Sequence, residues 1–216
     1  VGGTLGVTGV LTGTSLDISG DIDVDGTTNL DIVDVDGAVN FAADVTFADG
    51  ADIITASAGT SNFRAGVNAG NSIESGGNYN VAVGDEAGTA ITTGDQNVAI
   101  GYGAATALTT GANTVAIGYL AGDALTTGEN NIAIGKNALG AEDTHDFNIA
   151  IGSNALAVQN AGADTHNVAI GHNAGTAVST GIQNVIIGGL AGDSLTDADF
   201  NIAIGHTALG LDTLGS

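Results

Sequence analysis

Apolar and polar residues alternate over a short stretch that returns along most of the chain. In each copy an Asn or Thr precedes an apolar triplet and a Gly follows it, as in Asn97-Val-Ala-Ile-Gly101. A period of two is typical of a β-strand, because successive side chains of a strand point to opposite faces. The Val and Ile of each triplet are therefore predicted to share one face of a short strand, with the central Ala on the other.

The eight regular copies recur every 17 residues, with one interval of 19 caused by a two-residue insertion near residues 159–162. An Ala stands three residues after the Gly of every copy, including a degenerate first copy that begins at Asn62. Such a unit is too short for a helix pair but has the length of one coil of a parallel β-solenoid. The positions that bound the regular copies are Asn80 and Gly84, Asn97 and Gly101, Thr114 and Gly118, Asn131 and Gly135, Asn148 and Gly152, Asn167 and Gly171, Asn184 and Gly188, and Asn201 and Gly205.

The second half of the repeat has two forms. In the first form an apolar residue stands seven positions after the Gly, as Leu125 does after Gly118, and in the second a Leu stands four positions after it, as Leu139 does after Gly135. The Ala-Leu-Thr-Thr-Gly stretch of the first form, residues 124–128, predicts a second short strand. The second form turns polar after its Leu and predicts a looser, exposed loop. The fold class predicted is all-β, a parallel β-solenoid (β-roll) of about nine coils.

The first 60 residues differ from this pattern. Short alternating patches are separated by Gly and rich in Asp, and each predicted strand offers two or three inward side chains. Such strands cannot build a core alone and need partner chains. We therefore predict a β-rich shaft built from several chains over residues 1–60, followed by the β-roll over 61–216. Because the chain begins Val1-Gly2-Gly3 without Met, it is expected to be a fragment or a processed product.

Composition narrows the possible functions. The 216 residues include 36 Gly and no Pro, Cys, Met or Trp, and the net charge is −22 with only two basic residues. Such a surface repels phosphate, which argues against nucleic-acid partners and against anionic membranes. Without Cys there is no disulfide, thiol nucleophile or Cys-ligated zinc site. No apolar run approaches the roughly 20 residues of a membrane span, so no membrane insertion is expected.

The repeat resembles known fibrous proteins. Asn-Val-Ala-Ile-Gly followed by Ala resembles the head repeat of YadA-like trimeric autotransporter adhesins, although 17 residues is a longer period than theirs. The Ala-Gly-x-Ala-Leu-Thr-Thr-Gly form and the N-terminal Gly2-Gly-Thr-Leu-Gly-Val-Thr-Gly-Val string resemble phage tail fibres. These resemblances imply a left-handed β-roll in a homotrimer, and therefore a trimeric shaft over residues 1–60. The alanines of the repeat are expected to let neighbouring chains pack closely.

The resulting expectation is a structural and host-attachment segment of a phage tail fibre or related appendage, located in the virion. Its partners would be further copies of the chain and a cell-surface receptor or glycan of a host. Two alternatives remain, the head domain of a bacterial trimeric surface adhesin and a purely structural extracellular filament.

The position directly after the repeat Gly is the candidate receptor contact. Its residue type varies between copies, which is typical of an outward-facing row, and tyrosine is a favoured anchor for partners. The alternative is that these are exposed turn residues with no binding role. All four histidines are predicted to lie at the surface. The candidate contact residues are Tyr102, Tyr119, Lys136, His172 and His206.

One stretch resembles a metal-binding motif. Asp21, Asp23 and Asp25 alternate and are followed by Gly26, as in the opening of a calcium loop. Ile32 stands at the twelfth position, where a bidentate Glu is needed. The alternative is therefore the solvated face of a strand, with calcium a weak candidate and no other cofactor or metal predicted.

No catalytic activity is predicted. The sequence shows no arrangement of nucleophile and base, and no Gly-rich phosphate loop. A polysaccharide hydrolase needs paired carboxylates in a cleft, and a two-residue insertion is too short to build one. Ice binding is disfavoured because the threonines are adjacent in sequence, and neighbours in a strand point to opposite faces.

Overall fold

The computed structural model describes residues 57–211, and within this range every regular element is a strand of three residues. None of these residues belongs to a helix that could cross a membrane. The predicted shaft (1–60) lies almost wholly outside the described residues. All three candidate calcium ligands, Asp21, Asp23 and Asp25, also lie outside them. The strands are β1 (Phe63–Ala65), β2 (Val81–Val83), β3 (Val98–Ile100), β4 (Val115–Ile117), β5 (Ile132–Ile134), β6 (Ile149–Ile151), β7 (Val168–Ile170), β8 (Val185–Ile187) and β9 (Ile202–Ile204).

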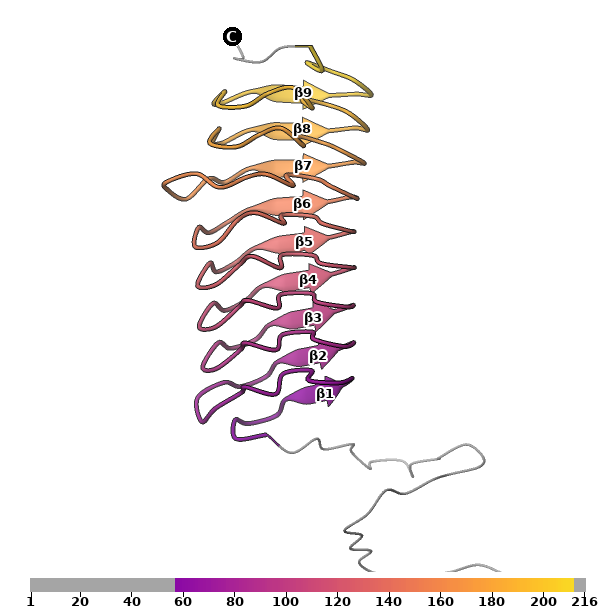
Figure 1. The fold of residues 1–216 in the computed structure, drawn as a ribbon. Helices are drawn as coiled ribbons and strands as arrows, with labels where there is room; N and C mark the ends of the chain where they lie inside the picture. The colour runs from indigo at the N-terminus through magenta and orange to yellow at the C-terminus, as the bar shows by residue number, and fades with distance from the viewer. Residues whose placement is uncertain (1–56, 212–216) are drawn as a thin grey trace, which may run out of the picture. The chain divides into compact units, whose positions relative to one another are not determined.

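The strands stack in sequence order into one parallel sheet (Figure 1). Equivalent repeat positions pair directly, as Val98 with Val115 and Ala99 with Ala116. One strand per 17-residue coil, each bonded to the next, is a parallel β-solenoid, so the predicted fold class is confirmed. At ~4.8 Å per coil, nine stacked strands span roughly 40 Å. The insertion forms the widest loop of the stack, just before β7 (Figure 1).

Each strand turns its central residue inward and its flanking residues outward. Ala99 and Ala116 are completely buried, whereas Val115 and Ile117 on the outer side are half-buried. The predicted separation of Ala from Val and Ile is confirmed. The prediction that alanines form the contact surface between chains is wrong, because these alanines, together with those three positions after the Gly, fill the interior of their own chain. Ala occupies this inward position in β2 to β7 and in β9, whereas in β8 the larger Ile186 is equally buried there.

The predicted second strand is also wrong. Residues 108–110 and 125–127 bond to neighbouring coils through a few backbone hydrogen bonds, such as Thr92 N to Thr109 O at 2.9 Å and Thr109 N to Thr126 O at 2.7 Å, but they form no strand. Each coil has several residues of positive φ, for example Gly118 (+134°), Leu120 (+51°) and Gly122 (+56°). These turns keep the rest of the coil from becoming extended. The coil therefore has one strand, with its remainder built from turns that bond to the next coil.

The two forms of the repeat are two ways of filling one core layer. Leu125, seven residues after its Gly, and Leu139, four residues after its Gly, are both completely buried. A Cβ added to Gly122 would lie 2.9 Å from Cδ1 of Leu125, so the two positions compete for one space. Coils with Leu four residues after the repeat Gly carry a polar residue seven residues after it. Two of these polar residues, Glu142 and Gln159, are fully buried.

The repeated Asn that precedes the strand is an internal hydrogen-bonding residue. Asn97 is 1% exposed, its Nδ2 donates to the carbonyl of Gly111 at 2.8 Å, and its Oδ1 accepts from the backbone amide of Thr114 at 2.9 Å. One side chain thus closes its own coil and joins it to the next. Asn80 and Asn184 repeat both bonds. An unmade bond at a buried polar group costs about 1–3 kcal/mol, which explains why the residue recurs.

Candidate functional site

The row directly after the repeat Gly faces outward, as predicted. Tyr102 and Tyr119 are 53% and 50% exposed, and Lys136, His172 and His206 are also exposed. Each side chain stands at the turn that ends a strand, so the solenoid presents one such residue per coil. The structure divides the candidates into two groups along the row. Tyr102, Tyr119 and Lys136 follow three consecutive strands, whereas His172 and His206 are separated by Gly189.

The two tyrosines stack on each other. Their ring centroids are 5.5 Å apart with an angle of 15° between the ring planes, and Nζ of Lys136 lies 5.9 Å from the Tyr119 centroid. A sugar ring inserted between them would need about 7 Å, two contacts of roughly 3.5 Å. The stack therefore offers ring edges, two phenol hydroxyls and an ammonium group to a partner. This arrangement favours contact by hydrogen bonds over a sandwich of the partner between the rings.

A second outward column of side chains was not predicted from the sequence. The residue before the buried Asn or Thr has a φ of +51° to +63° in all nine copies, and it carries aromatic rings at Tyr79, Phe147 and Phe200. Phe147 stacks on His166 of the next coil with centroids 5.0 Å apart. Variation of residue type at this position between copies is the signal that could have found it, as it did for the row after the Gly.

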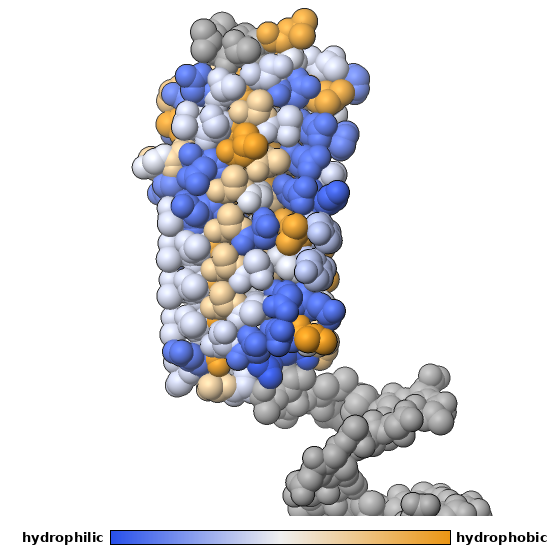
Figure 2. Space-filling view, in the orientation of Figure 1, coloured by the Kyte–Doolittle hydropathy of each residue, from blue (hydrophilic) through white to orange (hydrophobic). Residues whose placement is uncertain are grey.

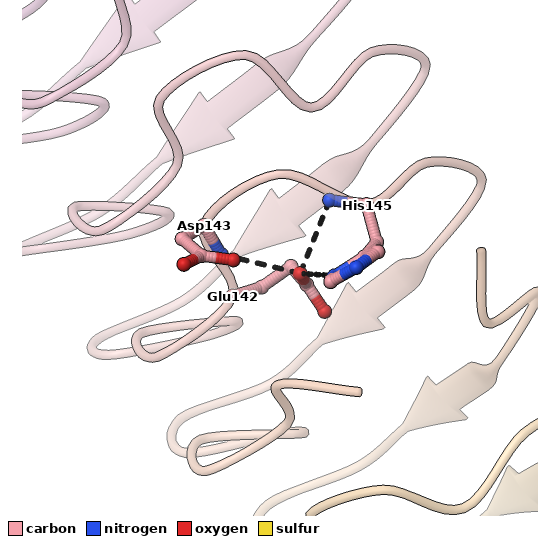
Figure 3. Close-up of side chains that lie close together, drawn as sticks. All are labelled: Glu142, Asp143 and His145. Atoms are coloured by element: carbon pink, nitrogen blue, oxygen red, sulfur yellow. Dashed lines mark hydrogen bonds and ion pairs between the residues drawn. The ribbon is translucent and has the colours of Figure 1, made fainter. Parts of the chain in front are cut away.

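The third group of functional side chains is an acidic cluster with a histidine (Figure 3). Glu142 is completely buried, and its Oε1 lies 2.7 Å from Nδ1 of His145. The same oxygen accepts from the backbone amides of Asp143 at 3.1 Å and His145 at 3.2 Å. Glu142 Oε2 is buried with no hydrogen-bond partner. Burial raises the pKa of the Glu142 carboxyl above its usual value of 4.5, and the hydrogen bonds with His145 only partly offset this.

His145 corrects the prediction that every histidine lies at the surface. Its side chain is only 16% exposed because it covers the buried carboxylate of Glu142. One ligand atom from each of Glu142, Asp143 and His145 can be chosen so that all three lie within 4.8 Å of one another. The sequence pattern predicts an exposed polar loop for these residues, whereas Glu142 in fact occupies the core position seven residues after Gly135.

The row and the cluster therefore offer different chemistry, the first an exposed aromatic and cationic surface and the second two carboxylates beside an imidazole. Comparison with protein-family models, with curated proteins and with solved structures finds no match to this chain. An assignment of function consequently depends on the solenoid itself and on the side chains that it presents.

Proposed function

We propose that the chain is a structural and host-attachment segment of an elongated homotrimeric fibre, as in a phage tail fibre. The observation that carries the proposal is the outer face of the sheet. Every strand from β2 to β9 has Val or Ile at both outward positions, and none of these positions is charged. With eight strands at ~4.8 Å spacing, the strip is about 10 Å wide and roughly 35 Å long, or roughly 350 Å². Its area is within the range of the largest apolar patch on a typical monomer, and such patches are often functional.

Further copies of the chain are the occupant that fits this strip. The chain carries a net charge of −22, so copies of it repel one another over most of their surface and can meet only where charge is absent. Three such strips facing a common axis would bury one another and leave the acidic surfaces outward. The resemblance to trimeric adhesin heads and phage fibres supports three copies over two. Figure 2 shows another property that suits a fibre, since residues of like hydropathy follow one another in columns along the solenoid.

The trimer is tested by placing charge on the strip. Ile117→Asp combined with Ile134→Asp is expected to convert the trimer into monomers, because six carboxylates would be buried around the axis without counter-ions. Sedimentation velocity would measure the change. Thr110→Asp combined with Thr127→Asp is the matched control, since both threonines are exposed and lie outside the strip. A wild-type chain that sediments as a monomer at micromolar concentration would overturn the proposal.

Attachment is assigned within this proposal to the row after the repeat Gly. Tyr102→Ala combined with Tyr119→Ala is expected to reduce binding to host cells or to a responding glycan at least tenfold, because large aromatic side chains often carry much of the energy of a contact. Tyr79→Ala is the control, as Tyr79 is 60% exposed but belongs to the other outward column. Equal binding by wild type and the double variant would remove the row from attachment. Absence of any cell-surface binding would leave a purely structural filament.

A further inference from the structure

We propose that Glu142, Asp143 and His145 form a binding site for a divalent transition-metal ion of the Zn²⁺ class. The ion would fasten the loop of residues 141–147 to the core of the solenoid. This site is separate from the apolar strip on the outer face of the sheet and from the row after the repeat Gly. The test of the metal site is therefore independent of the test of the fibre proposal.

Glu142 occupies a core position of the repeat. It stands seven residues after the repeat Gly, where other coils bury an aliphatic side chain such as Leu108, Leu125 or Leu195. A carboxylate removed from water must be paired, hydrogen-bonded or bound to a metal ion. The chain's basic residues lie elsewhere, since Arg64 Nη1 donates to the carbonyl of Gly70 and Lys136 lies over the Tyr119 ring.

The two carboxylate oxygens of Glu142 differ in their hydrogen bonding. Oε1 is within hydrogen-bond distance of three nitrogens, whereas Oε2 is buried without a partner. The next coil offers an internal comparison, because Gln159 occupies the same repeat position and is equally buried. There Oε1 accepts from Nδ2 of Asn167 and Nε2 donates to the carbonyl of Ser179 at 3.4 Å. A polar side chain can therefore be satisfied at this position by protein groups, whereas Oε2 of Glu142 has no such partner, and a bound cation would supply one.

The Glu142 carboxylate lies between the side chains of Asp143 and His145 (Figure 3). Two carboxylates and one imidazole form a mixed oxygen and nitrogen set, which suits Zn²⁺ and its neighbours better than Ca²⁺ or Mg²⁺, which prefer oxygen alone. Binding at Nδ1 of His145 requires that nitrogen to be unprotonated, so the affinity should fall when the pH is lowered.

The test is titration of the 216-residue chain, freed of metal by a chelator, with Zn²⁺, Ca²⁺ and Mg²⁺ in separate calorimetric experiments. We expect one Zn²⁺ site per chain with a micromolar or lower Kd, and a rise in Tm on adding Zn²⁺. Glu142→Gln and His145→Gln should each weaken Zn²⁺ binding at least tenfold, within the range seen when a ligand to a metal is lost or disturbed. His172→Gln is the matched control, because His172 is exposed and distant from the cluster in the repeat; it should bind Zn²⁺ as the wild type does.

Each variant is first checked by circular dichroism in the absence of metal, so that loss of binding is not mistaken for loss of the fold. If Glu142→Gln does not fold, His145→Gln and the control His172→Gln still decide the question. Failure of the wild type to bind Zn²⁺ would overturn the proposal. So would stoichiometric Zn²⁺ binding that persists unchanged in His145→Gln, since the ion would then be held elsewhere on the acidic chain.

Discussion

Gly118→Ala is expected to lower the free energy of unfolding by about 3 kcal/mol, which combines backbone strain with a steric clash. The φ of Gly118 is +134°, a conformation that residues with a Cβ rarely adopt. A Cβ at this position would also lie 2.8 Å from the carbonyl carbon and oxygen of Gly135 in the next coil. Because this contact is with backbone, it can be relieved only by separating two coils. Urea denaturation followed by circular dichroism would measure the loss.

Gly162→Ala is the matched control for this substitution. Gly162 lies in the insertion before β7, and a Cβ added there would meet no atom within 4 Å. A surface change of this kind is expected to alter stability by less than about 0.5 kcal/mol. Equal losses for the two variants would show that the glycines of the repeat are not required by the stacking of the coils.

The period and the strand of the repeat could be predicted from the sequence, because stacked coils place equivalent residues in equivalent surroundings. Gly118 illustrates this, since its contact with Gly135 is repeated by Gly101 with Gly118 one coil earlier. The inward face of the strand could not be predicted, because Ala116 and its neighbours Val115 and Ile117 are all apolar. Ala fills the space inside most coils, although Ile186 is buried at the same position in β8, and this space is known only from the closed structure.

Of the candidate site, the sequence predicted which residues face outward but not how their side chains are arranged. The outward row containing Tyr102 and Tyr119 was found because its residue types vary between copies, whereas its stacking depends on side-chain geometry that a pattern does not contain. Glu142 and His145 were read as part of a polar loop. Their burial arises because Leu139, four residues after Gly135, fills the core space of this coil. The position seven residues after Gly135 is then left to the polar side chain of Glu142.

The core leucine stands either four or seven residues after the repeat Gly. This alternation predicts that substitutions at Gly122 and Leu125 have strongly non-additive effects on the free energy of unfolding. Gly122→Leu alone would force its side chain against Cδ1 of Leu125, which lies 2.9 Å from the added Cβ, and overpacking of this kind costs roughly 3 kcal/mol. Leu125→Ala alone would empty the completely buried space of the leucine, at a cost of about 3 kcal/mol.

The double variant is expected to cost only about 1–2 kcal/mol, instead of the roughly 6 kcal/mol of two independent changes, because the side chain introduced by Gly122→Leu would fill the space that Leu125 leaves. The backbone permits this, since the φ of Gly122 is +56° and Leu139 and Leu156 occupy the same repeat position at +51° and +48°. Urea denaturation of the wild type, both single variants and the double variant would give the coupling energy. Additive losses would mean that the two positions fill separate spaces and that the two forms of the repeat are unrelated to core volume.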